Sequence, residues 1–275
     1  MTRNSPATGL RISTLILLVF LALPFTAKTQ EFEVGLLGGG TYYLGDLNPG
    51  GHFKNMGVAF GLLARYNLSD RWAVRITGFR GEIKADAGST NYMPSRGLSF
   101  TSPVTDISAI VEFNFFPYFT GSRRYPVSPY IYGGIGMTMF RPSAGGHELH
   151  PLGTEGQNDG YQGRSPYHLT QVNLPFGLGA KISVTKKLGL TVFWELHKLF
   201  TDYLDDVSTT YYLSGPAINP DDPAQYLSDP TMDHEPGWQR GNSSTKDWYA
   251  CSGITLTYKF ALGKGKRCRD LKGQQ

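Results

Sequence analysis

Cysteine is scarce in this chain of 275 residues, and long apolar segments are scarce as well. The two cysteines, Cys251 and Cys268, are too few for a fold that is held together by disulfides. Beyond residue 30, no segment reaches the roughly 18 consecutive apolar residues that a membrane-spanning helix requires. Any part of the mature chain that crosses a membrane must therefore do so as strands.

Positive charge is also scarce in the body of the chain, although the formal net charge is +4. Residues 1–30 contain three basic and no acidic side chains, and 261–275 contain five basic side chains and one acidic one. The segment between them, 31–260, has 18 basic and 21 acidic side chains. Because the excess of positive charge lies at the two ends, nucleic acid is not an expected partner.

Glycine and aromatic residues are abundant, with 34 Gly, 16 Tyr and 16 Phe, which favours strands over helices. The segment 56–68 alternates in character. Its even-numbered positions are apolar or aromatic throughout, whereas its odd-numbered positions mix glycines with Arg65 and Asn67. This pattern predicts a strand with one face toward lipid and the other toward the interior of a barrel.

Eight segments of this kind follow one another along the chain. We expect them at 31–46, 56–68, from 72 onward, around 106–115, at 129–140, 170–185 and 188–200, and ending at 260. Pro175 predicts a bulge or an unpaired position in the sixth segment. The sequence thus predicts an all-β fold over 30–260, an eight-stranded antiparallel transmembrane β-barrel of the outer membrane, surrounded by lipid.

The connections between these strands alternate in length. They are long after the first, third, fifth and seventh strands, and shorter after the second, fourth and sixth. In outer-membrane barrels the long loops are extracellular and the short turns are periplasmic, so both termini are expected in the periplasm. Aromatic residues near the expected periplasmic strand ends predict an interfacial girdle. These residues are Tyr66, Trp72, Tyr258 and Phe260.

The amino end has the features of a secretory signal peptide. Arg3 and Arg11 precede the apolar run 12–25, and we expect the signal peptide to cover 1–29, with cleavage after Ala27 as the alternative. The basic tail 261–275 is a candidate for docking onto an acidic periplasmic partner or anionic head groups. Its candidate residues are Lys264, Lys266, Arg267, Cys268 and Arg269. The two cysteines are expected on opposite sides of the bilayer and therefore unbridged.

Charged residues at inward positions predict a barrel that is filled rather than open. Arg65, Arg75 and Lys181 share the inward faces of their strands with Glu112 and Glu195. An eight-stranded barrel is just wide enough for its own side chains to fill it. We therefore expect a salt-bridged interior and no diffusion pore.

No catalytic residue, metal site or cofactor is expected. Glu195 and His197 share the inward face of the seventh strand, which leaves a lipid-modifying barrel enzyme as an alternative. Two such residues are more simply members of the internal polar network. His147 and His150 could offer two imidazoles to a metal ion, but no third ligand follows at a suitable spacing.

The connection 201–247 is long and rich in acids, with nine acidic residues against Arg240 and Lys246. The ligand pattern of an EF-hand is absent, so we expect a solvated acidic surface loop rather than an ion site. A connection of this length is commonly functional. A surface adhesin or binding protein that uses 214–246 is therefore a further alternative.

Several stretches are typical of one known family. The strongest is WELHKLFTDYLDDVSTTYY at 194–212, supported by EVGLLGGGTYYLGDL, by LPFGLGAKI and by ITLTYKF before the basic tail. With these stretches the chain resembles the PorG-like outer-membrane β-barrels associated with the type IX secretion system. The chain differs at His197 and Lys198, where a Gly-Tyr-Arg-like step is expected, and in its enlarged fourth outer loop.

The resemblance implies a non-enzymatic accessory protein that links the outer membrane to a periplasmic ring, through the ring's lipoprotein and its partner. It also implies a binding role for Asp202, Tyr203, Asp205 and Asp206 of the TDYLDDVS motif. A paralogue with another task is the alternative.

Overall fold

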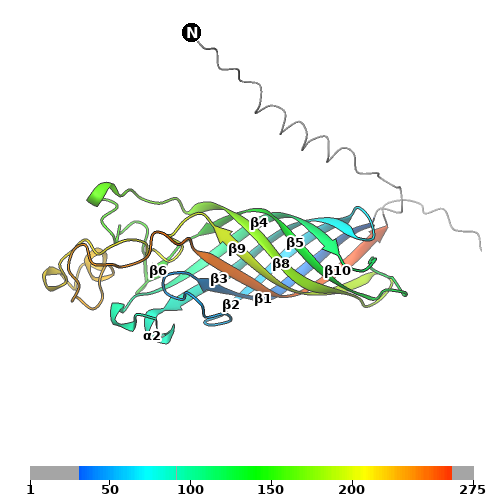
Figure 1. Cartoon of the computed structure of the whole chain (residues 1–275), viewed down its shortest axis with the longest axis horizontal. Helices are drawn as coiled ribbons and strands as arrows, with labels where there is room; N and C mark the ends of the chain where they lie inside the picture. The colour runs from blue at the N-terminus through cyan, green and yellow to red at the C-terminus, as the bar shows by residue number, and fades with distance from the viewer. Residues whose placement is uncertain (1–30, 91, 262–275) are drawn as a thin grey trace, which may run out of the picture.

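The computed structural model describes residues 31–90 and 92–261. Long strands form a barrel, and short helices and one small hairpin lie in its loops (Figure 1). The elements in chain order are β1 (Glu31–Leu44), β2 (Gly57–Asn67), β3 (Trp72–Asp86), α2 (Ala87–Thr90), η1 (Pro94–Arg96), β4 (Ser99–Asn114), β5 (Val127–Phe140), β6 (Ser143–Ala144), β7 (His147–Glu148), η2 (Tyr161–Gly163), β8 (Thr170–Ser183), β9 (Leu188–Leu199), η3 (Gly215–Ala217), α3 (Pro223–Tyr226) and β10 (Trp248–Ala261).

Two sequence-based predictions fall on other parts of the chain. The signal peptide 1–29 lies outside the described residues, as does the tail with Lys264, Lys266, Arg267, Cys268 and Arg269. Within 31–90 and 92–261, the helices are too short and too polar to cross a membrane.

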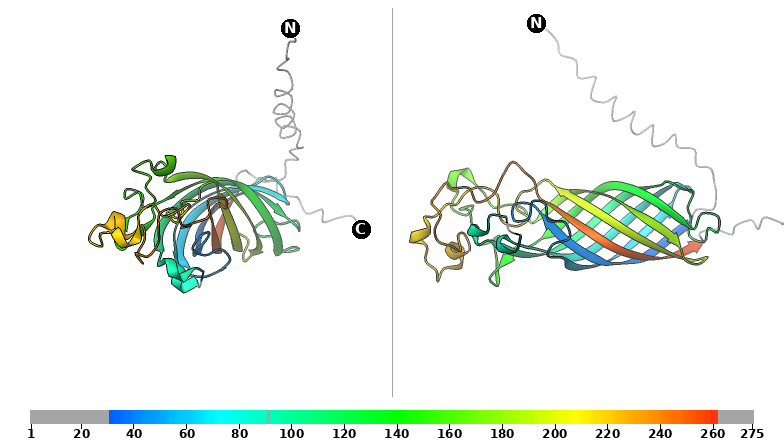
Figure 2. Two further views of the ribbon diagram at one scale, coloured as in Figure 1. Left: turned by 60° about the vertical axis from the view of Figure 1, so that its left-hand side comes forward. Right: turned by 60° about the horizontal axis from the view of Figure 1, so that its bottom comes forward.

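The eight long strands close into one antiparallel barrel. Each pairs with the next long strand along the chain, and β10 pairs with β1 from Glu31↔Ala261 to Leu44↔Trp248. Figure 2 shows the strands wound obliquely around the barrel axis. The small strands β6 and β7 form a hairpin in the loop between β5 and β8. The predicted fold class, an eight-stranded antiparallel barrel of the outer-membrane type, is confirmed.

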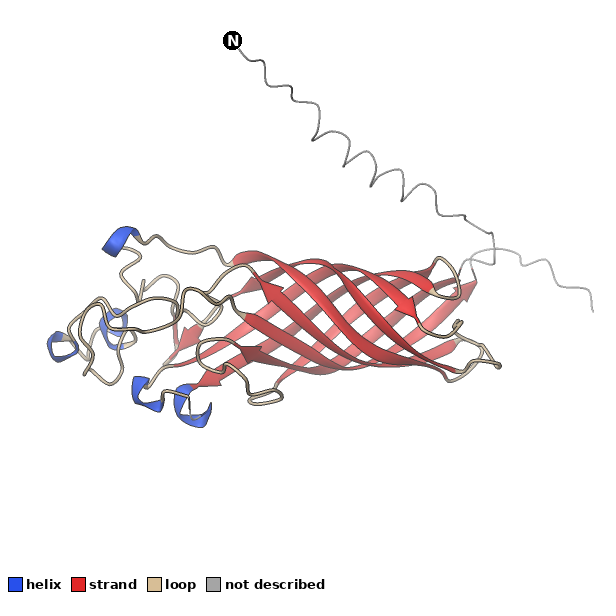
Figure 3. Ribbon diagram, viewed as in Figure 1, coloured by secondary structure: helices blue, strands red, loops and turns tan. Residues whose placement is uncertain are grey.

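The two ends of the barrel differ in structure. At the terminal end, where β1 begins and β10 ends, the strands are joined by 68–71, 115–126 and 184–187. At the opposite loop end they are joined by 45–56, 87–98, 141–169 and 200–247, and every helix of the described residues lies there (Figure 3). The expectation that the connection after the fourth strand is shorter than the long ones is wrong, because 115–126 is as long as 45–56 and 87–98. The two longest connections, 141–169 and 200–247, nevertheless both lie at the loop end.

The outer wall is apolar, as the alternation predicts. On β2, Val58, Phe60 and Leu62 are 60–77% exposed, whereas Ala59 between them and Leu63 and Arg65 beyond them are buried. Equivalent outward positions on the other strands carry similar side chains. We call the following residues the apolar belt: Val58, Phe60, Leu62, Ile76, Ile107, Ile135, Met137, Val172, Leu178, Val192 and Ile254. Such a belt is the surface that meets lipid in barrels of this type.

Aromatic side chains pack together on the wall near the terminal end. The Trp72 and Phe113 ring centroids lie 4.9 Å apart, as do those of Tyr258 and Phe260. Phe32 also packs against Phe260, at 6.4 Å. Amphipathic rings of this kind sit at the boundary between lipid and water.

Two details of the wall differ from a regular barrel. At Pro175 the pairing of β8 with β5 is interrupted, but the register is unchanged from Gly133↔Phe176 to Gly136↔Asn173. The predicted alternative of an unpaired position is therefore confirmed and that of a bulge is wrong, because proline removes a donor without adding a residue. Tyr42 is at an even-numbered position of β1, like the outward Val34 and Leu36, but it is buried, because the loop 45–56 folds over it and His52 Nδ1 lies 3.1 Å from its hydroxyl.

Candidate functional site

Charged side chains form a continuous series of ion pairs inside the barrel. The Glu112 carboxylate lies at its centre and contacts three cations. Oε2 of Glu112 is 2.8 Å from Nε of Arg65 and 2.6 Å from Nζ of Lys181, and Oε1 is 3.0 Å from Nε of Arg75. All four side chains are buried. The predicted salt-bridged interior is confirmed.

Two further glutamates complete this series. Glu33 Oε2 accepts a hydrogen bond from Arg65 Nη1 at 2.9 Å, and Glu195 Oε2 accepts one from Arg75 Nη2 at 2.9 Å. We call these side chains, with Glu112 and Lys181, the ion ladder; three carboxylates and three cations balance its charge. A neutral buried network avoids leaving an isolated charge in a low-dielectric interior. Sequence analysis did not single out Glu33, although it alternates with the outward Phe32 and Val34.

His197 extends the ion ladder toward the loop end. Its Nε2 lies 3.0 Å from Glu195 Oε1, and its Nδ1 lies 3.6 Å from Asp106 Oδ2. The imidazole stacks on Tyr249 at 4.3 Å, and the Ser108 hydroxyl donates to Asp106 rather than to the imidazole. A serine hydrolase requires a hydroxyl that is hydrogen-bonded to the imidazole. Glu195 and His197 therefore serve the internal packing of the barrel in this structure.

The connection 115–126 closes the terminal end of the barrel. Its residues Tyr118 and Thr120 are buried, and the Thr120 hydroxyl donates to Glu33 Oε1 at 2.8 Å. Lys259 Nζ donates to the Thr120 carbonyl and lies 3.0 Å from Glu31 Oε1. These contacts join the connection to the ion ladder and to the first and last strands of the barrel, β1 and β10.

The four loops at the other end fold together into one cap, which we define as 45–56, 87–98, 141–169 and 200–247. Glu155 of the third loop is fully buried and accepts hydrogen bonds from the fourth. Its donors include Ser208 N at 2.9 Å, the Thr209 hydroxyl at 2.6 Å and Arg240 Nη1 at 3.0 Å. Arg240 Nη1 also donates to the Asp206 carbonyl at 2.6 Å. Glu155 and Arg240 therefore join the third and fourth loops.

The first and second loops are joined to this centre by Arg96. Its guanidinium donates to the carbonyl of Arg240 at 2.6 Å and to the carbonyl of Asp46 at 2.7 Å. A second contact between the third and fourth loops comes from Tyr167, whose hydroxyl donates to Asp206 Oδ1 at 2.7 Å. Every loop of the cap thus contributes to a shared hydrogen-bond network.

The structure brings the predicted motif residues together, inside the cap. Asp202, Asp205 and Asp206 are at most 3% exposed, and the half-buried Tyr203 donates to Glu155 Oε2 at 3.2 Å. The expectation of a uniformly solvated acidic loop is therefore wrong. Five of its nine acids are buried: Asp202, Asp205, Asp206, Asp229 and Asp247. Three of them accept hydrogen bonds from loop N–H groups that have no strand partner: Asp205 from Val207 N at 3.0 Å, Asp247 from Leu204 N at 2.9 Å and Asp229 from His234 N at 3.0 Å.

Two of these aspartates share one hydroxyl group. Tyr43 Oη lies 2.7 Å from Asp205 Oδ2 and 2.8 Å from Asp247 Oδ1. Burial, followed by the charge of Asp247, holds the pKa of Asp205 well above its usual range. Burial also raises the pKa of Asp202 to about 7 and that of Asp206 to about 6. Because Tyr43 has a single proton to donate, the carboxyl pair is most stable when it retains a proton.

We expect the cap to loosen as the pH rises. The pKa values of Asp202 and Asp206 are raised in the folded cap, whereas exposed aspartates ionise near about pH 4. The folded cap therefore retains protons that the unfolded loop releases. The stability of the cap falls as the pH increases from about 4 through 7. Hydrogen exchange of the 200–247 amides, corrected for intrinsic rates, should be at least about tenfold faster at pH 8 than at pH 5.

The Asp205→Asn variant should reduce this pH dependence, because it removes one of the two carboxylates that share Tyr43. Asp221→Asn, at an exposed position in the same loop, is the matched control and should leave it unchanged. Equal protection of the 200–247 amides at pH 5 and pH 8 would contradict the assignment of raised pKa values to the buried aspartates of the cap.

Among residues 31–90 and 92–261, one group has ligand atoms close enough together to hold a metal ion. It consists of Asp229, Asp233 and His234, whose Nδ1 lies 2.9 Å from Asp229 Oδ1 and 3.0 Å from Asp233 Oδ1. Sequence analysis considered His147 and His150 as metal ligands instead and missed this group. Its signal in the sequence is the spacing Asp-x-Thr-x-Asp-His at 229–234. Hydrogen bonds within the group, including those of Thr231, already engage the same atoms.

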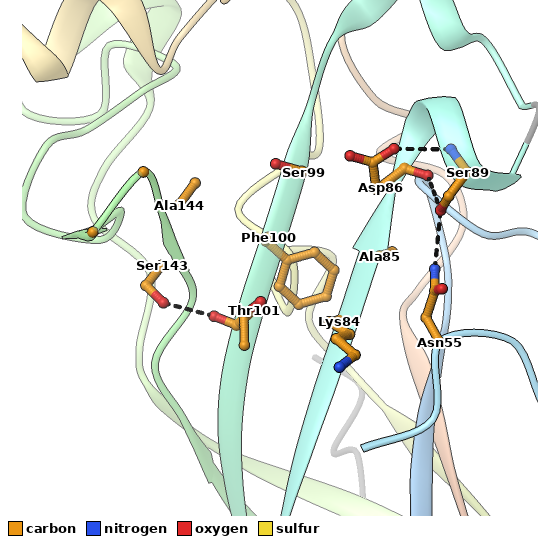
Figure 4. A pocket seen from close by; sticks show the side chains of 12 residues that line it. Asn55, Lys84, Ala85, Asp86, Ser89, Ser99, Phe100, Thr101, Ser143 and Ala144 are labelled. Carbon is orange, nitrogen blue, oxygen red and sulfur yellow. Dashed lines mark hydrogen bonds between the residues drawn. The ribbon is translucent and has the colours of Figure 1, made fainter.

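A polar cavity of about 450 Å³ lies at the edge of the cap, between the loop ends of β3 and β4 and the hairpin strand β6 (Figure 4). Its polar groups bond one another: Asn55 donates to Ser89 at 3.1 Å, and Ser143 donates to the Thr101 carbonyl at 2.9 Å. Lys84 at its edge forms a 3.6 Å ion pair with Glu82. The cavity therefore has few polar groups free to select a ligand.

The terminal end carries an exposed group of basic side chains, which sequence analysis did not single out. The connections 68–71, 115–126 and 184–187 contain five basic residues and one acidic residue, Asp70. We call the five the basic rim: Arg71, Arg123, Arg124, Lys186 and Lys187, all exposed. The signal in the sequence was the presence of Arg or Lys in every connection on this side.

Comparison with solved structures gives matches of low sequence identity. Neisserial surface protein A is 11% identical, with 85% of this chain and 98% of that one covered and a TM-score of 0.42. The N-terminal β-barrel domain of Pseudomonas aeruginosa OprF is 11% identical, with coverage of 85% and 98% and a TM-score of 0.38. Ail, the attachment invasion locus protein of Yersinia pestis, is 12% identical, with coverage of 84% and 97% and a TM-score of 0.38 in its complex with sucrose octasulfate.

None of the curated proteins matches this sequence. A family model does: the domain of unknown function DUF6089 matches residues 11–211, which is more than half of the chain. The protein therefore belongs to the DUF6089 family.

Proposed function

We propose that this protein is a non-enzymatic outer-membrane barrel that anchors a periplasmic assembly, as an accessory component of the type IX secretion machinery. The partner class comes from the resemblance of 194–212 to PorG-like barrels, and the partners would be periplasmic ring proteins, including a lipoprotein. The observation that carries the proposal is the basic rim, which surrounds the end of the barrel where β1 begins and β10 ends.

The filled interior supports an anchoring role. The ion ladder occupies the lumen, the connection 115–126 closes one end, and the cap covers the other. An eight-stranded barrel packed in this way lacks the aqueous channel of larger porins. It therefore suits a component that holds a position in the membrane better than one that transports a solute.

The charge of the terminal end supports an acidic partner. Opposite charges across an interface steer two proteins together and fix their relative orientation. β10 ends at Ala261 at this end of the barrel, and the basic tail continues the chain from there. In sequence, the tail adds Lys264, Lys266, Arg267 and Arg269. We include these residues and Cys268 in the proposed docking surface.

The motif residues have a different place in the proposal. Asp202, Tyr203, Asp205 and Asp206 lie within the cap, at the opposite end from the basic rim. We propose that these residues contribute to binding indirectly, by stabilising the conformation of the cap. The carboxylates of the three aspartates are buried and therefore cannot contact a partner directly.

Neutralising the basic rim tests the anchoring role. We expect a variant with Arg123→Gln, Arg124→Gln, Lys186→Gln and Lys187→Gln to capture the ring lipoprotein at least about tenfold less efficiently in pull-downs from detergent-solubilised membranes. The capture by the wild type should also weaken as salt is added, because salt screens exposed charges.

The matched control is Lys54→Gln with Lys246→Gln, which removes exposed charge from the cap instead. This control should capture the lipoprotein as well as the wild type does. Full capture by the rim variant, with secreted cargo unchanged, would refute the proposed role.

A second candidate function, binding at the cell surface, is favoured by the outer face of the cap. Trp238 is 56% exposed there, and Asp221 and Glu235 are exposed as well. Deleting 214–246 would remove Arg240, which holds the cap together, so point variants give a cleaner test. Trp238→Ala should weaken binding of the protein to cell surfaces if the cap binds a surface ligand, and should leave it unchanged if the protein only anchors a ring.

A further inference from the structure

A groove of about 550 Å³ runs along the outer wall where the apolar belt approaches the cap. It crosses β3, β4, β5 and the start of β8. Residues from these strands and the following loop line it, including Arg80, Pro103, Thr105, Met139, Arg141 and Leu169. The groove therefore lies on the wall of the barrel, outside the ion ladder and outside the buried network of the cap.

The strand register places the groove directly beside the belt. Arg80 pairs with Thr105, Thr105 with Met139, and Met139 with Thr170, so the four residues are neighbours across four strands. Thr105, Met139 and Thr170 each lie two residues nearer the loop end than a belt residue on the same face of the same strand. Those belt residues are Ile107 on β4, Met137 on β5 and Val172 on β8. The groove is thus continuous with the lipid-facing surface.

The groove carries two arginines with free donor groups. Arg80 points outward and is exposed, and it forms no ion pair with any described residue. The Arg141 side chain is 69% exposed, and its Nη1 is 3.9 Å from Oε1 of Glu148, which is itself 57% exposed. An exposed pair at this distance contributes little. Both guanidinium groups are therefore available to a ligand.

We propose that this groove binds a membrane lipid through the phosphate of its head group. Arg80 and Arg141 would hold the phosphate, because the guanidinium fork matches phosphate oxygens in geometry and charge. Pro103, Met139 and the adjoining belt residues would contact the acyl chains. The occupant is a lipid because the groove opens onto the belt: a ligand there must offer apolar chains next to an anionic group.

With the loop end outward, as the sequence predicts, the phosphorylated lipid of the adjoining leaflet is lipid A. The test uses the full mature protein in non-ionic detergent, titrated with diphosphorylated lipid A, and counts bound lipid by native mass spectrometry. Arg80→Gln with Arg141→Gln should weaken binding by about 100-fold, if each charge-assisted contact contributes about tenfold.

Arg123→Gln with Arg124→Gln is the matched control, because it removes two exposed arginines from the terminal end. It should change binding by less than about twofold. Lipid A without its phosphates should bind the wild type as weakly as diphosphorylated lipid A binds the groove variant. Cold SDS gel mobility of each variant verifies that the barrel is folded.

Two results would overturn the proposal. The first is equal binding of diphosphorylated lipid A by the wild type and the groove variant. The second is full displacement of the lipid by an equal concentration of inorganic phosphate, which would indicate an ion site that makes no use of the belt.

Discussion

Glu112→Gln is expected to destabilise the barrel by about 3–5 kcal/mol, the usual cost of removing one partner from a buried ion pair. The substitution keeps the size of the side chain but removes the negative charge that Arg65, Arg75 and Lys181 surround. Glu33 and Glu195 then face three cations, and the ion ladder carries a net positive charge in a buried space. Urea unfolding in lipid vesicles measures the loss.

Two further variants separate this electrostatic effect from a change of shape. Glu82→Gln, at an exposed position on β3, should change the unfolding free energy by less than about 1 kcal/mol. Glu112→Gln combined with Lys181→Gln should recover part of the loss, because one surplus cation is removed with the carboxylate. A Glu112→Gln barrel as stable as the wild type would contradict the account of the ion ladder.

Arg240→Gln is expected to open the cap while leaving the barrel intact. Arg240 holds Glu155 of the third loop and the carbonyls of Asp206 and Ser228 in the fourth. Glutamine has too few donors for these contacts, so Glu155 would keep a buried charge without its counterion. We expect a local loss of about 3–5 kcal/mol. The measurement is the rate at which a protease cleaves within 200–247.

Lys246→Gln provides the control for this second variant. Lys246 lies in the same loop but is exposed, so its replacement should leave the cleavage rate close to that of the wild type. The urea midpoint of the Arg240→Gln barrel should also be unchanged, since the barrel strands have their own hydrogen bonds and ion ladder. Loss of barrel stability together with the cap would show that the two parts unfold as one unit.

The barrel could be predicted from the sequence because its pattern is local. Successive side chains of a strand point to opposite faces, so one apolar face identifies the lipid side and the residues between identify the interior. Arg65, Arg75, Glu112, Lys181 and Glu195 were all placed inside on this basis, and all five belong to the ion ladder. Consecutive strands of such a barrel pair antiparallel, and an even strand number lets the last strand pair antiparallel with the first.

The cap could not be predicted in this way, because its contacts join residues that are distant in sequence and follow no period. Glu155 and Arg240 are 85 positions apart, and Arg96 and Arg240 are 144 apart. From the sequence, the acids of 201–247 looked like a solvated surface. Their burial depends on donors elsewhere in the chain, such as the hydroxyls of Tyr43 in β1 and Tyr167 in the third loop.

By itself, then, the sequence determined which residues face lipid and which face the lumen, since the alternation of a strand leaves no other choice once one face is apolar. Only the tertiary structure decided which charges meet, which acids are buried, and where free basic side chains gather. Those outcomes depend on how strands curve into a closed wall and how loops converge above it, and distances of that kind are set in space rather than along the chain.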